Sequence, residues 1–357
     1  MLRLFMRLLL YCLPLVTCVA YAQSPWERIA QLPATLELGQ GFIDHDTSPL
    51  RLRLVKSSQT AAGLKPSTDT LFDYTPDEWL EARDKDGLYH LGDINLRVRT
   101  IDNPVWQAYS TATKRSPVTP ITVAGNTLAA ADLTPTLPAD APFRVRRYWQ
   151  SVASGLVLRF EVTNTGVKPL EIGSLGIPMI FNNILQNKSL EEAHADNIFA
   201  DPYVGQDAGY LQVCRLDGHG PVLLVLPHEN GSFEAYNPLN DDPTPRGVVF
   251  EGFHEWMVHS KAHAETEWKD VKQWNEPTSS VLQPGEAKNF ALRFVLAPEI
   301  RKIEETLTRE QRPVAIGLPG YVLPHNVPAK LFLHYHSRIR SVESEPKNAL
   351  EIRKRKK

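Results

Sequence analysis

The sequence YWQSVASGLVLRFEVTNTGVKPLEIGSLGIPMIF, residues Tyr148–Phe181, decides the fold class of this chain. Over Leu156–Thr163 an apolar side chain occurs at every second position, the period that places one set of side chains on a buried face. Asn164–Gly166 then supplies residue types that tolerate positive φ, and Pro169 precedes a second strand beginning at Leu170. The stretch therefore predicts a hairpin within a large antiparallel β-sandwich.

Strands of similar character recur along the chain. Leu50–Val55, Ile94–Ile101, Phe143–Trp149 and Asn289–Ala297 alternate between apolar and other residues, which is typical of a sheet with one buried face. Gly220–His228 is apolar at consecutive positions, which predicts a central strand covered on both faces. The sequence predicts roughly ten or more strands and one helix, whereas ordinary domains have about a third of their residues in helices. This indicates an all-β fold, most simply a two-sheet sandwich.

Three further segments complete the expected organisation. One short helix after the main strands is predicted from Pro298 to about Arg309, because Ile303 and Leu307 recur at helical spacing. Lys330–Ser337 reads as a last strand. Lys56–Arg83 is dominated by Ser, Thr, Asp and Pro, so we expect a long surface loop there.

Residues 1–22 have the pattern of a secretory signal peptide. Arg3 and Arg7 precede an apolar core, and small residues before position 23 fit the cleavage rule. We therefore expect a secreted, extracellular protein that has no membrane contact after cleavage. In a eukaryotic secretory pathway the sequons at Asn187 and Asn230 would be glycosylation candidates.

Charge and cysteine content limit the partners and the redox chemistry. A formal net charge of −2 gives no electrostatic reason to expect nucleic acid as a partner. Of three cysteines, two lie within the signal peptide and only Cys214 remains, so no intrachain disulfide is expected. The sequence suggests no cofactor.

The segment Asn182–Tyr210 is a candidate sugar-contact loop. It concentrates amide, carboxylate and tyrosine side chains, which give directional hydrogen bonds to hydroxyls and flat faces for the C–H side of a sugar. The alternative is a solvated loop without a ligand. The candidate residues are Asn182, Asn183, Asp201, Tyr203, Gln206, Asp207 and Tyr210.

A second cluster, Phe250–Pro277, adds Glu251, Glu255 and Trp256 as candidate substrate contacts. His254 and His259 are five residues apart, so they do not match the zinc pattern His-Glu-x-x-His, and no third ligand accompanies His259 and His263. We therefore expect no metal site and structural histidines.

Pairs of carboxylates in the sequence leave open the alternative that the chain is itself a glycoside hydrolase. Asp201 with Asp207, or Glu251 with Glu255, are formal candidates for the two acids of glycoside hydrolysis. Sequence gives no distances between them, and no nucleophile motif or phosphate-binding loop stands in a suitable context. The catalytic residues, and whether the chain is an enzyme, stay undetermined at this level.

Several strings carry a resemblance to a known family, among them PATLELGQGF, TNTGVKPLEIGSLGIPMIFNN, DPYVGQDAGYLQV and GYVLPHNVPAKLFL. Over about Pro33 to Leu350 the chain resembles the N-terminal portion of a secreted domain-of-unknown-function family within the six-hairpin glycosidase-like superfamily. The run Ser189–Pro227 carries most of this likeness.

The resemblance implies a galactose-mutarotase-like β-supersandwich over residues 23–337, of the kind found beside an (α/α)6 toroid in glycoside hydrolases and polysaccharide lyases. Residues 338–357 would form a polar, basic tail leading to that toroid, which we expect to be missing from this chain. The implied function is that of a carbohydrate-active, glycoside-hydrolase-like protein whose loops contact an oligo- or polysaccharide or the absent toroid. A non-catalytic structural or protein-interaction module is the alternative.

Overall fold

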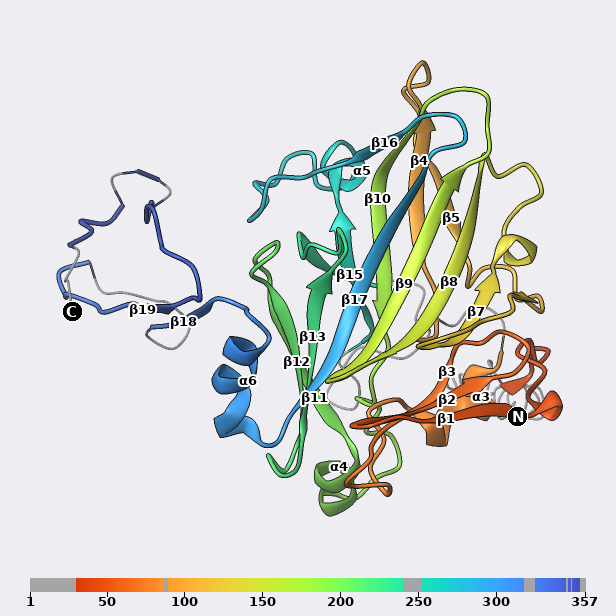
Figure 1. Cartoon of the computed structure of the whole chain (residues 1–357), viewed down its shortest axis with the longest axis horizontal. Coiled ribbons are helices and arrows are strands. Elements are labelled where there is room, and N and C mark those ends of the chain that lie inside the picture. Colours follow the sequence, from red (N-terminus) through yellow and green to blue (C-terminus); the bar gives the residue numbers. More distant parts are fainter. Residues whose placement is uncertain are drawn as a thin grey trace, which may run out of the picture.

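The computed structural model describes residues 30–85, 89–239, 252–317, 325–344, 346–347 and 349–353 (Figure 1). Two large antiparallel sheets enclose the main core, as expected for the fold class. The eight-stranded sheet contains, in spatial order, β11 (Ile198–Tyr203), β12 (Tyr210–Arg215), β13 (Val222–His228), β17 (Ala287–Ala297), β9 (Gly155–Asn164), β8 (Phe143–Val152), β7 (Thr127–Asp132) and β6 (Thr119–Pro120).

The six-stranded sheet packs against it. Its order is β14 (Ala235–Pro238), β15 (His254–His259), β10 (Leu170–Met179), β4 (Asn95–Thr100) and β5 (Gln107–Ser110), with β16 (Ser280–Leu282) also paired to β10. Two smaller sheets are formed by β1 (Phe42–Asp46), β2 (Leu50–Val55) and β3 (Ala61–Pro66), and by β18 (Val314–Ile316) and β19 (Phe332–His334).

Helices are short and lie at the ends of strands. The described α-helices are α3 (Leu80–Arg83), α4 (Leu190–Asp196), α5 (Lys261–Ala264) and α6 (Ile303–Arg309), and the 3-10 helices are η1 (Leu38–Gln40), η2 (Asp77–Trp79), η3 (Thr134–Thr136) and η4 (Ile300–Lys302). The helix expected after the main strands corresponds to η4 and α6. Figure 1 shows α6 beside the end of β17, and β18 and β19 away from the two large sheets.

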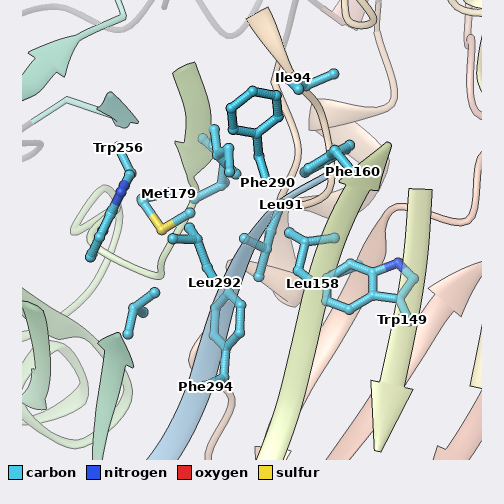
Figure 2. Packing of buried hydrophobic residues seen from close by; sticks show 14 of the residues in the cluster. Leu91, Ile94, Trp149, Leu158, Phe160, Met179, Trp256, Phe290, Leu292 and Phe294 are labelled. Atoms are coloured by element: carbon cyan, nitrogen blue, oxygen red, sulfur yellow. The ribbon is translucent and has the colours of Figure 1, made fainter. Parts of the chain in front are cut away.

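Alternation correctly identifies which residues fill the core. Leu156, Leu158, Phe160 and Val162 of β9 are fully buried, and they meet Phe290, Leu292 and Phe294 of the neighbouring β17 (Figure 2). These side chains point toward Met179 and Trp256 of the six-stranded sheet. The central position of β13, between β12 and β17, is also confirmed, because both of its faces are buried.

The prediction that β9 and β10 form a hairpin is wrong. These strands do not pair; β9 lies in the eight-stranded sheet and β10 in the six-stranded sheet, so the Asn164 turn crosses from one layer to the other. The Asn164 amide secures the crossing, because its Nδ2 donates to the carbonyls of Lys168 and Leu282 at 2.9 Å each. Periodicity predicts which face of a strand is buried, but it contains no information on which sheet receives the strand.

Two other expectations need correction. Lys56–Arg83 is not a surface loop, because it contains β3 and buries Phe72 and Tyr74. The segment that follows β10 is less loop-like than predicted, since it forms α4 and β11. A capping box signals α4: the Ser189 hydroxyl accepts from the Glu192 amide, and the Glu192 carboxylate accepts from the Ser189 amide.

Candidate functional site

The candidate site is the outer face of the eight-stranded sheet, defined as the face turned away from the main core. Alternate residues of β8 and β9 point outward here and are half-buried, whereas their neighbours along each strand are buried. The strand register aligns residues into rows across the sheet. One row consists of His228, Ala291, Arg159, Tyr148 and Ala130; the next contains Asn289, Glu161, Arg146 and Asp132.

A pair of stacked tyrosines lies at one side of this face. Tyr203 and Tyr210 end β11 and begin β12, and their rings stack at 4.5 Å with planes 7° apart. Tyr203 is 40% exposed. Asp201 lies two residues earlier on β11, so it shares the face with Tyr203. A partly exposed aromatic surface beside a carboxylate is suited to binding a polyol.

The turn that joins these tyrosines is fixed by its backbone. Gln206 adopts a positive φ of 52°, its amide donates to the Phe233 carbonyl at 2.8 Å, and the Asp207 carbonyl accepts from Arg312 at 2.9 Å. A Cβ at Gly209 would come within 2.8 Å of the Tyr203 carbonyl, so glycine is required there. The hairpin therefore holds the tyrosine pair in a defined position.

An arginine on a tyrosine ring occupies the middle of the face. Arg159 of β9 is paired across the sheet with Tyr148 of β8, and its guanidinium carbon lies 4.2 Å from the centre of the Tyr148 ring. The Arg159 Nε is buried and has no hydrogen-bond partner among the described residues, as is also the case for the Nε of the surrounding arginines Arg146, Arg293 and Arg312, and no ion pair involves Arg159. The surrounding arginines differ, because each has an acidic or carbonyl partner.

The neighbouring arginines are paired with acidic side chains or backbone carbonyls. Arg146 lies 3.8 Å from Asp132 and 3.5 Å from Glu161, and Arg293 lies 3.0 Å from the nearly buried carboxylate of Glu310. Arg312 donates to the carbonyls of Asp207 and Pro227.

A histidine stands at the end of the same row. Burial lowers the pKa of His228 below its ordinary value, and the nearby Arg293 and Arg312 lower it further against the opposing effect of Glu229. His228 is therefore a neutral imidazole near neutral pH, next to fixed positive charges. Such a group can exchange hydrogen bonds with hydroxyls or accept a proton.

The structure brings together some of the predicted residues and separates others. Asp201, Tyr203, Gln206, Asp207 and Tyr210 all belong to the β11–β12 hairpin.

The two asparagines are placed elsewhere, in a hydrogen-bond network. Asn182 is buried, and its side-chain oxygen accepts from Asn197 Nδ2 at 3.1 Å, while Asn183 donates to the Gly252 carbonyl at 3.0 Å. Glu251 lies outside the described residues.

Glu255 and Trp256 lie on β15, in the other sheet. The Glu255 carboxylate accepts from Asn95 at 2.7 Å and from Asn237 at 2.9 Å, and it sits where a Cβ at Gly176 would clash. Trp256 is fully buried and stacks on Phe233 at 3.7 Å, so its ring has no face open to solvent.

The sequons, histidines and cysteine are also placed. Asn187 and Asn230 both adopt positive φ at turns. His259 ends β15 and His263 lies in α5, and both are buried. In the part of the chain that the structure describes, no three His, Cys, Asp or Glu residues gather to hold a metal ion. Cys214 is buried on β12, and burial raises the pKa of its thiol.

Sequence analysis missed Tyr148, Arg159, His228, Arg293 and Arg312. The signal for the first two was present, because outward positions of predicted strands that carry Tyr and Arg can form a polar sheet face. The others required knowledge of which strands are neighbours.

Three solved structures show what the chain resembles. One described as a polysaccharide lyase matches with a TM-score of 0.56 at 13% identity, over 77% of this chain and 36% of that one. Galactose mutarotase-like proteins from Lactobacillus casei ATCC 334 and Clostridium acetobutylicum give TM-scores of 0.42 and 0.46 at 11% and 8% identity, over 72% of this chain and 100% and 95% of theirs. No curated protein matches the sequence.

The two packed sheets thus define a class, the large antiparallel β-sandwich domain, and at these identities the likeness concerns the fold alone. The chain belongs to the DUF5695 family, a family of unknown function whose model matches residues 53–357. Membership of a domain-of-unknown-function family is confirmed; the six-hairpin glycosidase link stays a prediction. Among the described helices, none has the length and apolar character that crossing a bilayer requires.

Proposed function

We propose that this chain is the carbohydrate-binding β-sandwich of a polysaccharide-processing protein, and that the outer face of the eight-stranded sheet holds the glycan. The observation that carries the proposal is the stacked pair Tyr203 and Tyr210, with Tyr203 40% exposed, beside the polar side chains of the same hairpin. The fold shared with a polysaccharide lyase supports it. Aromatic rings cover the apolar face of a sugar, and the neighbouring polar groups orient its hydroxyls.

Affinity electrophoresis tests the proposal directly. The chain would be run in native gels containing a panel of neutral and acidic polysaccharides, beside a reference protein with no polysaccharide affinity. We expect at least one polymer to retard the chain and not the reference. If every polymer leaves its mobility unchanged, the carbohydrate-binding function is wrong.

We further propose that the domain is exported and works beside an (α/α)6 toroid, as the family resemblance implies. The mass of the protein recovered from the native host tests export, because removal of residues 1–22 gives a defined loss. Sequencing the transcript through codon 357 tests the toroid. A reading frame that continues into helical hairpins supports it, and a stop codon there contradicts it for this gene.

Exposed apolar side chains near the C-terminus favour the second candidate function, a protein-interaction module. Leu331 is 53% and Phe332 61% exposed, at or beside the short β19. Cross-linking in the native host followed by mass spectrometry distinguishes the two functions: a protein partner cross-linked to this segment supports the interaction module.

A further inference from the structure

We infer that the glycan bound by the outer face is acidic, and that Arg159 binds its carboxylate. This inference rests on the proposed function and names the substrate class. It predicts a polymer that contains uronic acid residues, which present a planar carboxylate together with the C–H face of a sugar ring.

The charge of Arg159 is not neutralised by any acidic side chain among the described residues. Arg146, one row away, is shared between Asp132 at 3.8 Å and Glu161 at 3.5 Å, whereas no ion pair involves Arg159 among the described residues. The buried Nε without a hydrogen-bond partner is a feature that Arg159 shares with Arg146, so the missing ion pair is what sets Arg159 apart. An anionic ligand would supply the missing counter-charge.

The Arg159 guanidinium is restrained by its neighbours on the sheet. The group lies 4.2 Å above the Tyr148 ring, and Tyr148 is itself flanked across the sheet by Ala130 on β7. On its other side Arg159 faces Ala291 of β17, a small residue that is fully buried. A guanidinium that rests on a ring has fewer orientations open to it, and its fork of donors matches a planar carboxylate better than a hydroxyl.

Most charged groups around the Arg159 guanidinium are already paired with one another. Glu161, two residues along β9 on the same face, is paired with Arg146, and Glu310 is paired with Arg293. His228 at the end of the row is neutral near neutral pH. Glu161 and Glu310 are therefore already neutralised, while Glu229, 3.9 Å from the neutral His228, keeps its charge at the end of the row. Arg159 itself has no ion pair among the described residues, so an incoming carboxylate meets its full positive charge.

The chemistry of the anion can be resolved further, because a glycan carries either carboxylates or sulfate esters. Both would be attracted to a guanidinium. We assign the carboxylate, whose two oxygens can both pair with the single fork that Arg159 offers. A guanidinium also pairs with tetrahedral oxyanions, so a sulfated polymer without carboxylates is the comparison that decides between the two.

The experiment uses the full chain and four polymers in the same affinity gels. These are polygalacturonate, the same polymer with its carboxyl groups chemically reduced to alcohols, a sulfated carrageenan without carboxylates, and a neutral xylan. We expect polygalacturonate to bind at least about tenfold more tightly than its reduced form, with the difference narrowing as salt rises. This comparison needs no variant, so it stands even if a substitution impairs folding.

Two matched variants then locate the contact. Arg159→Gln should reduce affinity for polygalacturonate by about tenfold and leave affinity for the reduced polymer unchanged. Arg97→Gln, which removes an equal charge that is paired with Glu267 on the six-stranded sheet, away from the proposed glycan face, should change both affinities less than about twofold. Equal losses in the two variants would assign the effect to general positive charge and overturn the role of Arg159.

The gel results distinguish a failure of the acidic-glycan assignment from a failure of carbohydrate binding itself. Equal binding of native and reduced polygalacturonate, or binding of the neutral xylan alone, overturns the acidic substrate and leaves carbohydrate binding intact. Binding of carrageenan alone overturns the carboxylate assignment. Binding of no polymer in the wider panel overturns the proposed function as well.

Discussion

The outer faces of the two large sheets use arginine in opposite ways. On the six-stranded sheet Arg99 lies over the Trp106 ring at 3.9 Å, just as Arg159 lies over Tyr148 on the eight-stranded sheet. Yet Arg99 also contacts Glu171 at 2.8 Å and Glu265 at 2.9 Å.

The two faces also differ in how the acidic groups are supplied. Arg97, the neighbour of Arg99 on β4, makes a two-pronged pair with Glu267 at 2.6 and 2.7 Å. Glu265 and Glu267 come from the segment after α5, which folds over that sheet. The comparison teaches that one outer face is closed by its own acidic side chains, while the centre of the other retains an unneutralised cation. Part of the second face, at Leu224, Leu226 and Val295, is covered by Ile303 and Leu307 of α6. Under the proposed function the uncovered part around Arg159, called the open face below, takes the ligand, and the closed face serves stability.

Removal of the carboxylate that closes the first face should have the largest effect. Glu171 is 4% exposed and accepts from Arg99, from Lys261 at 2.6 Å and from Ser279 at 2.8 Å. Glu171→Gln removes the buried partner of Arg99 and Lys261 and leaves them only the more exposed Glu265, so we expect a loss of about 3 kcal/mol in the free energy of unfolding by urea. The matched variant Glu161→Gln on the open face should cost less than about 1 kcal/mol.

The pH dependence of the Glu171 variant gives a second readout. Burial opposes ionisation of Glu171, but the hydrogen bonds from Lys261, Ser279 and Arg99 outweigh it and leave its pKa below the ordinary value. The contribution of a carboxylate with a lowered pKa is complete above its unfolded pKa of about 4.3 and disappears as pH falls below it. The stability difference between wild type and Glu171→Gln should therefore shrink below about pH 4. A constant difference down to pH 3 would contradict the charge-based explanation.

Histidine titration should give the next largest effect. His259 is buried, and its ring nitrogens hydrogen-bond with the hydroxyls of Thr278 and Ser280 at 2.7 Å each. Burial, reinforced by Lys288, lowers the pKa of His259 to about 4. Because the unfolded chain takes up this proton near pH 6.5, lowering the pH from 7 to 5 should cost about 2 kcal/mol through this residue.

His228, on the open face, provides the control for the pH dependence that we attribute to His259. His259→Gln should flatten the stability profile between pH 7 and 5, whereas His228→Gln should alter it less because His228 is only half-buried. Urea unfolding at several pH values measures both slopes. An equal change in the two variants would contradict the difference in burial between the faces.

A smaller effect is expected from the aromatic side chains that reach solvent. Tyr203→Ala should weaken polysaccharide binding about fivefold, since it removes one of two stacked rings on the open face. Trp274 is 92% exposed but follows the segment that closes the other sheet, so Trp274→Ala should leave the affinity unchanged. If Trp274→Ala proves the more damaging substitution, the ligand lies on the other side of the molecule.

The sequence predicts the strands well and the partners of their side chains poorly. The alternation in Asn95–Thr100 and Gly155–Asn164 correctly predicts that Arg97, Arg99 and Arg159 point away from the core. It cannot predict which of them is neutralised, because Glu265 and Glu267 lie more than 160 residues from Arg99 and Arg97.

The same limit applies to the candidate site. The local cluster in the β11–β12 hairpin was found because its members are close in sequence. The row that joins His228 to Arg159 depends on a sheet order that places β17 between β13 and β9. Strand order is decided by packing between distant segments, which periodicity along one segment does not contain.

The smallest effect should come from Arg159 itself, when stability rather than binding is measured. Its stacking on Tyr148 contributes about 0.5 to 1 kcal/mol at most, and the loss of hydration at its unpartnered Nε acts in the opposite direction. Arg159→Gln should therefore change the free energy of unfolding by less than about 0.5 kcal/mol. Urea unfolding, with Glu171→Gln as the reference for a large loss, measures this difference.

Together with the binding assay, that result decides what the residue is for. A variant as stable as the wild type that has lost affinity for polygalacturonate would show that the Arg159 charge serves the ligand and not the fold. A loss above about 2 kcal/mol would instead show that the guanidinium stabilises the open face as strongly as a partnered charge does. In that case the arginines of both faces would stabilise the fold, and they would differ only in which groups they contact. The Arg159 charge would then be no evidence for a ligand on the open face.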